Sequence, residues 1–380
     1  MFYWHFESRS DSQKDPLVFW LTGGPGCSSV TALFAENGPY KIRDDLNLTK
    51  NPYSWNEHSN IVYVDQPVGT GFSKAGLNEF VVDENGVAAD FFQFLQDFYT
   101  LFPQYAGREM FVTGESYAGH YIPAITAKIV TEKDTRMNLV GVAIGNGLVD
   151  PYNQYQEYVN YAYENNLIGN IQYVLLKGAF YICKQMIKYN IPFVLTMKEC
   201  QMSVEAIMGN PMKPKFNKYD IREKCDVPPR CYDFSQISKF LMRQDVIGLL
   251  GVQGRQWANC KDDVRRALYT DWMLNLSPKI TLLLDIKINI LVYTGDKDFI
   301  CNWRGGEKWT NNVQWAKKEE FQKAEYKKWY SFGEIKSVDN LHFLRVYDAG
   351  HMVPMNKPEA SLKMINQFYS NIYLTILQIP

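Results

Sequence analysis

The sequence predicts an α/β fold with a mainly parallel central sheet and an inserted helical subdomain. Short apolar segments rich in Val, Ile and Phe recur along the chain, and each ends near Gly, Asp or Asn. Segments of this kind are typical of strands that are buried on both faces. The expected strands cover residues 17–21, 60–64, 109–113, 139–144, 289–293 and 343–347. Between the second and third of them, apolar residues from Val87 to Phe102 repeat at helical spacing, and such alternation indicates a parallel sheet.

The alternation of strands and helices stops after about residue 150 and resumes near residue 289. The intervening stretch is rich in Tyr and Met, contains several cysteines and includes a proline-rich tract at residues 210–214. We interpret it as an insertion. The expected organisation is a first part of the α/β core at residues 1–150, a helical subdomain at 151–284 and a second part of the core at 285–370.

The composition argues against binding to nucleic acid or to a membrane surface. The chain has 40 basic and 41 acidic side chains, a formal net charge of -1, and thus no basic excess that would attract phosphates. Apolar runs stay well below the roughly 20 residues of a membrane-spanning helix. The N-terminal residues 1–9 read as an alternating strand and not as a signal peptide, so we expect the chain to begin within a fold.

A serine in a strand–turn–helix context is the first candidate for catalysis. The expected strand 109–113 runs into Gly114, Glu115 and Ser116, and a segment compatible with a helix follows from Ala118. Small residues around such a serine permit the strained turn of a nucleophile elbow, which lifts the hydroxyl clear of the sheet. Ala118 stands where the commonest G-x-S-x-G pattern has Gly, so an ordinary turn serine stays open as the alternative.

A serine nucleophile needs an acid and a histidine later in the chain, each after a strand. Asp298 and His351 meet this demand, and His351 lies in a loop that contains glycine. His351 would accept the proton of the Ser116 hydroxyl, while Asp298 would fix the tautomer of the imidazole and stabilise its protonated form. The competing acid is Asp296. The competing histidines, which we expect to be packing or surface residues, are His5, His58, His120 and His342.

Acyl transfer also requires backbone N–H groups that stabilise the oxyanion of the tetrahedral intermediate. The glycine-rich turn at residues 23–26 can supply one such group, and the residue after the serine supplies another. We assign the N–H groups of Gly24 and Tyr117 to this role, with a plain structural loop as the alternative. A phosphate-binding loop is excluded because the Gly-Lys-Ser/Thr ending is missing.

Five segments together resemble the signature motifs of the serine carboxypeptidases, closest to the plant carboxypeptidase III type. They follow one another in family order and are residues 21–29 (LTGGPGCSS), 64–73 (VDQPVGTGFS), 114–121 (GESYAGHY), 295–303 (GDKDFICNW) and 350–354 (GHMVP). The resemblance implies an α/β-hydrolase fold and removal of the C-terminal amino acid from peptides in an acidic compartment. It implies no metal and no organic cofactor.

The resemblance further implies a site for the terminal carboxylate of the substrate, built from Thr22, Gly23, Glu36 and Glu115. Two neighbouring glutamates that face a carboxylate cannot all be charged, so at least one is expected to be protonated and to donate a hydrogen bond. Acidic pH should therefore favour binding. The commonest family pattern has Asn at the position of Thr22, whose hydroxyl can donate one hydrogen bond only.

Two pockets for substrate side chains also follow from the resemblance. The pocket for the leaving residue is mapped onto Tyr219, Tyr232 and Met352. The pocket for the residue on the acyl side is mapped onto Tyr117, Trp272, Ile300 and Cys301. These residues predict a preference for apolar side chains on both sides of the scissile bond, although each aromatic residue could equally belong to the core.

Seven cysteines allow three disulfides and leave one thiol free. By resemblance the pairs are Cys27–Cys260 and Cys225–Cys231, with Cys183–Cys200 as the remaining pair. Cys301 would then be free and would line the active site. Two sequons, at Asn47 and Asn275, are candidates for N-glycosylation.

Two alternative functions stay open. Plant relatives on this scaffold transfer acyl groups from sugar esters, but they carry Asp where this chain has Glu115, which favours the peptidase. The other alternative is an inactive, truncated homologue, because family members begin upstream with a signal segment and the first strands of the sheet. The family implies peptide substrates, a monomer or homodimer, and a place in the secretory pathway, either extracellular or vacuolar.

Overall fold

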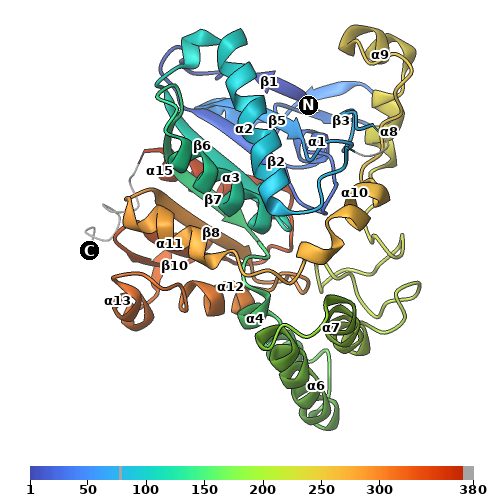
Figure 1. Ribbon diagram of the computed structural model, residues 1–380. Helices are drawn as coiled ribbons and strands as arrows, with labels where there is room; N and C mark the ends of the chain where they lie inside the picture. The colour runs from blue at the N-terminus through green and yellow to red at the C-terminus, as the bar shows by residue number, and fades with distance from the viewer. Residues whose placement is uncertain (77–78, 371–380) are drawn as a thin grey trace.

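The computed structural model of the protein describes residues 1–76 and 79–370. A nine-stranded sheet with the order β1-β5-β2-β6-β7-β8-β11-β10-β9 forms its centre (Figure 1). Its strands are β1 (Phe2–Phe6), β2 (Leu17–Thr22), β5 (Asn60–Asp65), β6 (Glu109–Glu115), β7 (Asn138–Gly145), β8 (Asn289–Gly295), β9 (Lys327–Trp329), β10 (Gly333–Val338) and β11 (Leu341–Val346). A separate small sheet pairs β3 (Tyr40–Ile42) with β4 (Leu48–Lys50).

The predicted parallel sheet is confirmed. Strands β5, β2, β6, β7, β8 and β11 run parallel to one another, and antiparallel pairs occur at the two ends of the sheet, where β1 pairs with β5 and where β10 joins β11 and β9. All residues of β2 and β5 are buried, which explains their continuous apolar character. Sequence analysis anticipated the six parallel strands and the N-terminal strand but not β9 and β10.

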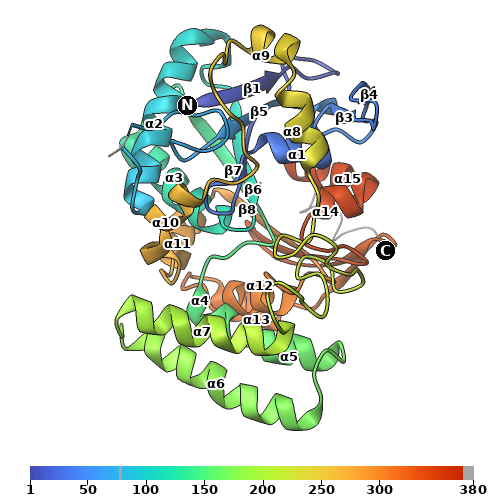
Figure 2. The same cartoon turned by 90° about the vertical axis from the view of Figure 1, so that its right-hand side faces the viewer.

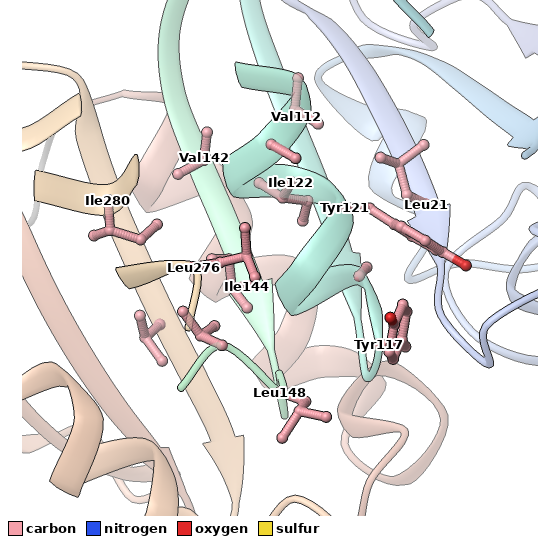
Figure 3. Close-up of a cluster of buried hydrophobic side chains, with 14 of the residues drawn as sticks. Leu21, Val112, Tyr117, Tyr121, Ile122, Val142, Ile144, Leu148, Leu276 and Ile280 are labelled. Carbon is pink, nitrogen blue, oxygen red and sulfur yellow. The ribbon is translucent and has the colours of Figure 1, made fainter. Parts of the chain in front are cut away.

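Helices cover both faces of the sheet. On one face, α2 (Glu84–Leu101) packs on α3 (Ala118–Glu132), and α11 (Ser277–Asp285) packs on α3 and β8. Of the helical pattern predicted from the sequence, Val87, Phe91, Phe94, Leu95 and Phe98 lie in the core, whereas Leu101 is exposed. Figure 3 shows the core beneath α3, where Ile122 lies near Val112 of β6 and Ile144 of β7. Tyr117 and Leu148 lie at the end of this cluster, so the core supports the loops that follow β6 and β7.

The opposite face is covered by α1 (Val30–Ala35) and α15 (Pro358–Tyr369), which bury Val30, Leu33, Met364 and Phe368 in a second apolar cluster. The remaining helices of the two core segments are α12 (Trp303–Thr310), α13 (Lys318–Lys323) and α14 (Val353–Asn356). Short 3₁₀ helices occur at Trp55–Glu57, Pro103–Tyr105 and Tyr269–Asp271.

Between β7 and β8 the described secondary structure is helical except for an isolated bridge at Asn217 and Asp220 and one at Cys260. The helices before α11 are α4 (Pro151–Gln154), α5 (Glu157–Glu164), α6 (Asn170–Lys188), α7 (Phe193–Met208), α8 (Ser235–Leu241), α9 (Gln244–Leu250) and α10 (Asp262–Ala267). Helices α5, α6 and α7 form a group away from the sheet, beyond α4 and α12 (Figure 2). The boundaries of the proposed insertion stay a prediction, and α11 lies against the sheet layer. None of the described helices is long and apolar enough to cross a membrane.

Candidate active site

The turn between β6 and α3 holds Ser116 in a strained conformation. Its φ of 65° lies in the left-handed region, which residues other than glycine rarely adopt. The Ser116 N–H donates to the Gly145 carbonyl at 3.0 Å, and its own carbonyl accepts from the Gly119 N–H at 3.0 Å. A side chain at position 114 would meet the Leu21 carbonyl oxygen at 2.1 Å, so Gly114 is required there. A strained serine between a strand and a helix is the geometry that a nucleophile elbow requires.

His351 and Asp298 are joined by a buried hydrogen bond. Their side chains are 3% and 0% exposed, and Nδ1 of His351 donates to Oδ2 of Asp298 at 2.8 Å. Because a carboxylate only accepts hydrogen bonds, this contact places the proton on Nδ1 and leaves Nε2 as an acceptor. Ser116 and His351 line the same cavity. The three predicted catalytic residues therefore lie at one edge of the sheet, after β6, β8 and β11.

Asp298 is held in place by three further hydrogen bonds. Its carboxylate accepts from the N–H groups of Ile300 at 2.9 Å and Cys301 at 3.1 Å, and from Nδ2 of Asn146 at 2.8 Å. Asn146 in turn accepts from the Gly295 N–H at 3.1 Å. Sequence analysis missed Asn146. The sequence did contain a signal for it: Asn146 is a polar residue between two glycines, directly after a buried strand. Residues at this position lie at the same edge of the sheet as those that follow the parallel neighbour β8.

The competing residues occupy other environments. Asp296 forms an ion pair with Lys297 at 3.1 Å and not with His351. Of the histidines, His58 is exposed. His5 contacts the Tyr105 hydroxyl, His120 the Leu148 carbonyl and His342 the Ser337 hydroxyl. None of these five residues is among the described residues that line the cavity with Ser116.

The glycine-rich turn after β2 lies directly against the nucleophile elbow. A side chain at Gly23 would come within 2.3 Å of the Tyr117 backbone nitrogen, so only glycine allows this approach. Among the described residues, the N–H groups of Gly24 and Tyr117 have no acceptor. An oxyanion hole requires free donors of this kind. Ser28, which follows this turn, donates a hydrogen bond from its hydroxyl to the carboxylate of Asp65 at 2.5 Å. Burial raises the pKa of Asp65 to about 6.

Glu36 and Glu115 form a buried pair of carboxyl groups. Their side chains lie in the core, with residue exposures of 2% and 1%. Burial raises the pKa of Glu36 to about 8. Burial, together with the neighbouring Glu36 carboxyl, raises the pKa of Glu115 well above its usual range. At acidic and neutral pH the pair is therefore mainly protonated and can donate hydrogen bonds.

The other members of the expected carboxylate site lie beside this pair. Thr22 is the last residue of β2, next to Gly23, and its hydroxyl accepts a hydrogen bond from the Trp20 indole N–H at 3.0 Å. This leaves the hydroxyl proton of Thr22 for a further acceptor. Thr22 and Glu115 line the cavity with Ser116, whereas Glu36 is not among the described lining residues and lies behind Glu115.

All the residues expected to line the two side-chain pockets border one cavity of about 520 Å³. Tyr219 packs 5.2 Å from the His351 ring and stacks on Tyr232 at 5.6 Å. On the other side, the Tyr117 and Trp272 rings lie 5.2 Å apart. Met352, Ile300 and Cys301 complete the predicted set. The cavity also has lining residues that sequence analysis missed, notably Gln201, Val204, Glu205 and Met208 of α7, and the cations Lys218, Arg230, Lys261 and Arg265.

Three disulfides join the predicted pairs Cys27–Cys260, Cys183–Cys200 and Cys225–Cys231. The first ties the glycine-rich turn to the segment before α10. Cys301 is a free, half-buried thiol that lines the cavity. Burial and the nearby Asp298 charge raise its pKa well above the usual range, so the thiol form dominates at neutral pH.

Asp298, Cys301 and His351 offer donor atoms within 4.8 Å of one another, a spacing that a metal ion could use. The chemistry of the set does not fit a metal. Nδ1 of His351 donates to Asp298, and the raised pKa of Cys301 disfavours the thiolate that a metal requires. The two sequon residues, Asn47 and Asn275, are both exposed, which is a requirement for glycosylation but not a test of it.

A strained serine after a central strand, with a buried histidine–aspartate pair at the same edge of a parallel sheet, is typical of hydrolases that use a serine nucleophile. The family described as serine carboxypeptidase matches residues 1–371. The "Serine carboxypeptidase-like" protein of Oryza sativa subsp. japonica is 42% identical and the match covers 97% of this chain and 89% of that protein. For serine carboxypeptidase 3 of Hordeum vulgare the identity is 41%, and the match covers 97% of this chain and 74% of that protein.

A solved structure also indicates the serine carboxypeptidase family. The crystal structure of KEX1(delta)p, a prohormone-processing carboxypeptidase from Saccharomyces cerevisiae, superposes with a TM-score of 0.87 at 29% identity. The superposition covers 97% of this chain and 86% of that chain. The chain belongs to the serine carboxypeptidase family and is a serine-type carboxypeptidase. The predicted α/β-hydrolase fold is thereby confirmed.

Proposed function

We propose that this carboxypeptidase cleaves the C-terminal peptide bond through an acyl-enzyme formed on Ser116. The hydrogen bond between His351 and Asp298 is the observation that carries the proposal, because it leaves Nε2 of the imidazole ready to accept the serine proton. The Ser116 oxygen attacks the carbonyl carbon while its proton passes to His351. The N–H groups of Gly24 and Tyr117 stabilise the resulting oxyanion.

The intermediate collapses when the C–N bond breaks and His351 returns the proton to the leaving amine. Water then attacks the acyl ester with His351 as the base, and the Ser116 hydroxyl is released with the shortened peptide. The departing amino acid carries the terminal carboxylate, which the protonated pair Glu36–Glu115, Thr22 and Gly23 would bind. Above the pKa of about 8 of Glu36, ionisation of the pair would repel that carboxylate, so peptide binding is favoured at acidic pH.

The test is release of free amino acid from an N-blocked dipeptide by the purified chain, measured as kcat and KM across pH. We expect KM to rise as pH increases toward 8, Ser116→Ala to abolish turnover, and a C-terminally amidated peptide to be a poor substrate. Glu36→Gln, which stays neutral at every pH, should weaken the dependence of KM on pH. A KM that does not change with pH would contradict the role given to the two glutamates.

The same assay separates the alternatives. Acyl transfer from a sugar ester without peptide hydrolysis would identify an acyltransferase, and lack of both reactions would favour an inactive homologue. We also propose that the protein matures in the secretory pathway. The three disulfides and the two exposed sequon residues, Asn47 and Asn275, support this placement, because disulfides persist in oxidising compartments.

A further inference from the structure

The cavity carries an excess of positive charge, and the proposed catalytic mechanism assigns no role to it. Four cationic residues line it, namely Lys218, Arg230, Lys261 and Arg265. Three acidic residues also line it: Glu205, Asp262 and Glu115, the last of which is mainly protonated. Among the described residues, none of the four cations forms an ion pair. Cations without counterions in a partly enclosed cavity attract anionic groups of a ligand.

Lys218 is the cation most firmly placed beside the catalytic residues. Its carbonyl accepts from the N–H groups of Phe299 at 3.2 Å and Ile300 at 3.0 Å. The next residue, Tyr219, accepts from the His351 N–H at 2.7 Å. The backbone of Lys218 is therefore fastened between the loop that carries Asp298 and the loop that carries His351. Its side chain is half-buried.

The Lys218 ammonium lies on the side of the cavity expected to hold the leaving residue. Its Nζ is 5.1 Å from the centroid of the Tyr219 ring, which itself stacks on Tyr232. Of the acidic lining residues, Glu205 accepts a hydrogen bond from Gln201 of its own helix at 3.0 Å, and Asp262 lies in the first turn of α10. Arg265 lies over Trp272 at 5.8 Å, on the acyl side.

We propose that Lys218 determines specificity by favouring an acidic C-terminal residue, glutamate above all. The methylene groups of a glutamate side chain would pack on the aromatic walls of Tyr219 and Tyr232, and its carboxylate would pair with the ammonium. This pocket combines the apolar preference expected from the sequence with a charge that the motif residues do not include. The inference rests on the proposed peptidase function and adds a substrate class to it.

The test compares two blocked dipeptides that differ only in the C-terminal residue, Glu or the isosteric Gln, at about pH 6, where the glutamate side chain is ionised. We expect the wild type to show a higher kcat/KM for Glu, on the order of fivefold, as for a partly screened ion pair. Lys218→Gln should bring the ratio close to one, with a larger loss of kcat/KM for the Glu peptide than for the Gln peptide. Lys218→Arg should keep the preference, and high salt should reduce it.

Lys215→Gln is the matched control, because Lys215 is an exposed lysine near Lys218 that is not among the described lining residues. The ratio should stay at its wild-type value in this variant. An unchanged ratio in Lys218→Gln, or an equal loss on both peptides, would overturn the inference, since an equal loss would mean that Lys218 binds the terminal carboxylate. If the enzyme hydrolyses both peptides with no preference for Glu, the inference about Lys218 is refuted but the proposed peptidase function stands. If it hydrolyses neither peptide, the proposed peptidase function is refuted.

Discussion

Replacing Glu36 by glutamine should stabilise the protein at neutral and alkaline pH and leave it little changed at acidic pH. Glu36 is 2% exposed, and its carboxyl group lies within hydrogen-bonding reach of the Glu115 carboxyl group. Its pKa rises from 4.5 to about 8 because the charged form would be buried. Glutamine has nearly the same shape but never ionises.

The sign follows from proton binding. Between pH 4.5 and about 8 the folded protein keeps the Glu36 proton that the unfolded chain has lost, so the free energy of unfolding falls as pH rises through this window. At about 1.4 kcal/mol for each tenfold change in acidity, this pKa difference corresponds to an upper limit of about 5 kcal/mol. Relaxation around a buried charge reduces that penalty. We expect Glu36→Gln to gain about 2 to 3 kcal/mol relative to the wild type as the pH rises from 5 to 8, since part of the titration window lies below pH 5.

The assay is denaturant unfolding followed by tryptophan fluorescence at pH 5 and pH 8, with unfolding midpoints and slopes compared at both. Glu325→Gln, a change at an exposed glutamate that is not among the described lining residues, controls for loss of a surface charge. Glu115→Gln tests the other half of the pair if the first variant fails to fold. The reasoning is refuted if wild-type stability does not fall with pH, or if Glu36→Gln gains no more at pH 8 than at pH 5.

Two further predictions concern the catalytic loop. Asp298→Asn should lower kcat by about 10³ to 10⁴-fold with little change in KM, because the amide would favour the wrong tautomer of His351; steady-state kinetics showing a loss below tenfold would contradict this. A bulky mercurial should inhibit the enzyme by reacting with Cys301, which lines the cavity, while iodoacetamide should react slowly at neutral pH because burial raises the thiol pKa. Cys301→Ser should be resistant to the mercurial, and full activity with Cys301 shown by mass spectrometry to be modified would exclude the prediction.

The parallel strands and the catalytic motifs were predictable because each depends on local sequence. A strand buried on both faces must be apolar throughout, and the residues that follow it reach the same edge of the sheet as those of its parallel neighbours. Ser116, Asp298 and His351 were found in this way. The antiparallel strand β9 was missed because it has only three residues, Lys327–Trp329, of which two are exposed.

Residues that depend on the meeting of distant segments were not predictable. Asn146 follows β7 and acts on Asp298, which follows β8, and no local pattern links the two. Lys218 lies in an irregular segment whose backbone bonds to residues distant in the sequence, among them Phe299, Ile300 and His351. Nothing in the residues around it distinguishes it from the exposed Lys215, so its exposure and its neighbours had to come from the structure.

The buried glutamate pair links substrate recognition to stability. A site that binds a carboxylate through protonated glutamates must keep Glu36 and Glu115 away from water, since solvation would return their pKa to the usual range and leave two negative charges facing the ligand. The same burial makes the fold less stable as the pH rises, because ionisation of either group leaves a charge in the core. If the pair serves only packing, glutamine at position 36 should improve stability at pH 8 without raising KM for peptides. If it serves carboxylate binding, the gain in stability should be accompanied by a higher KM at acidic pH, as expected when a functional residue trades stability for activity.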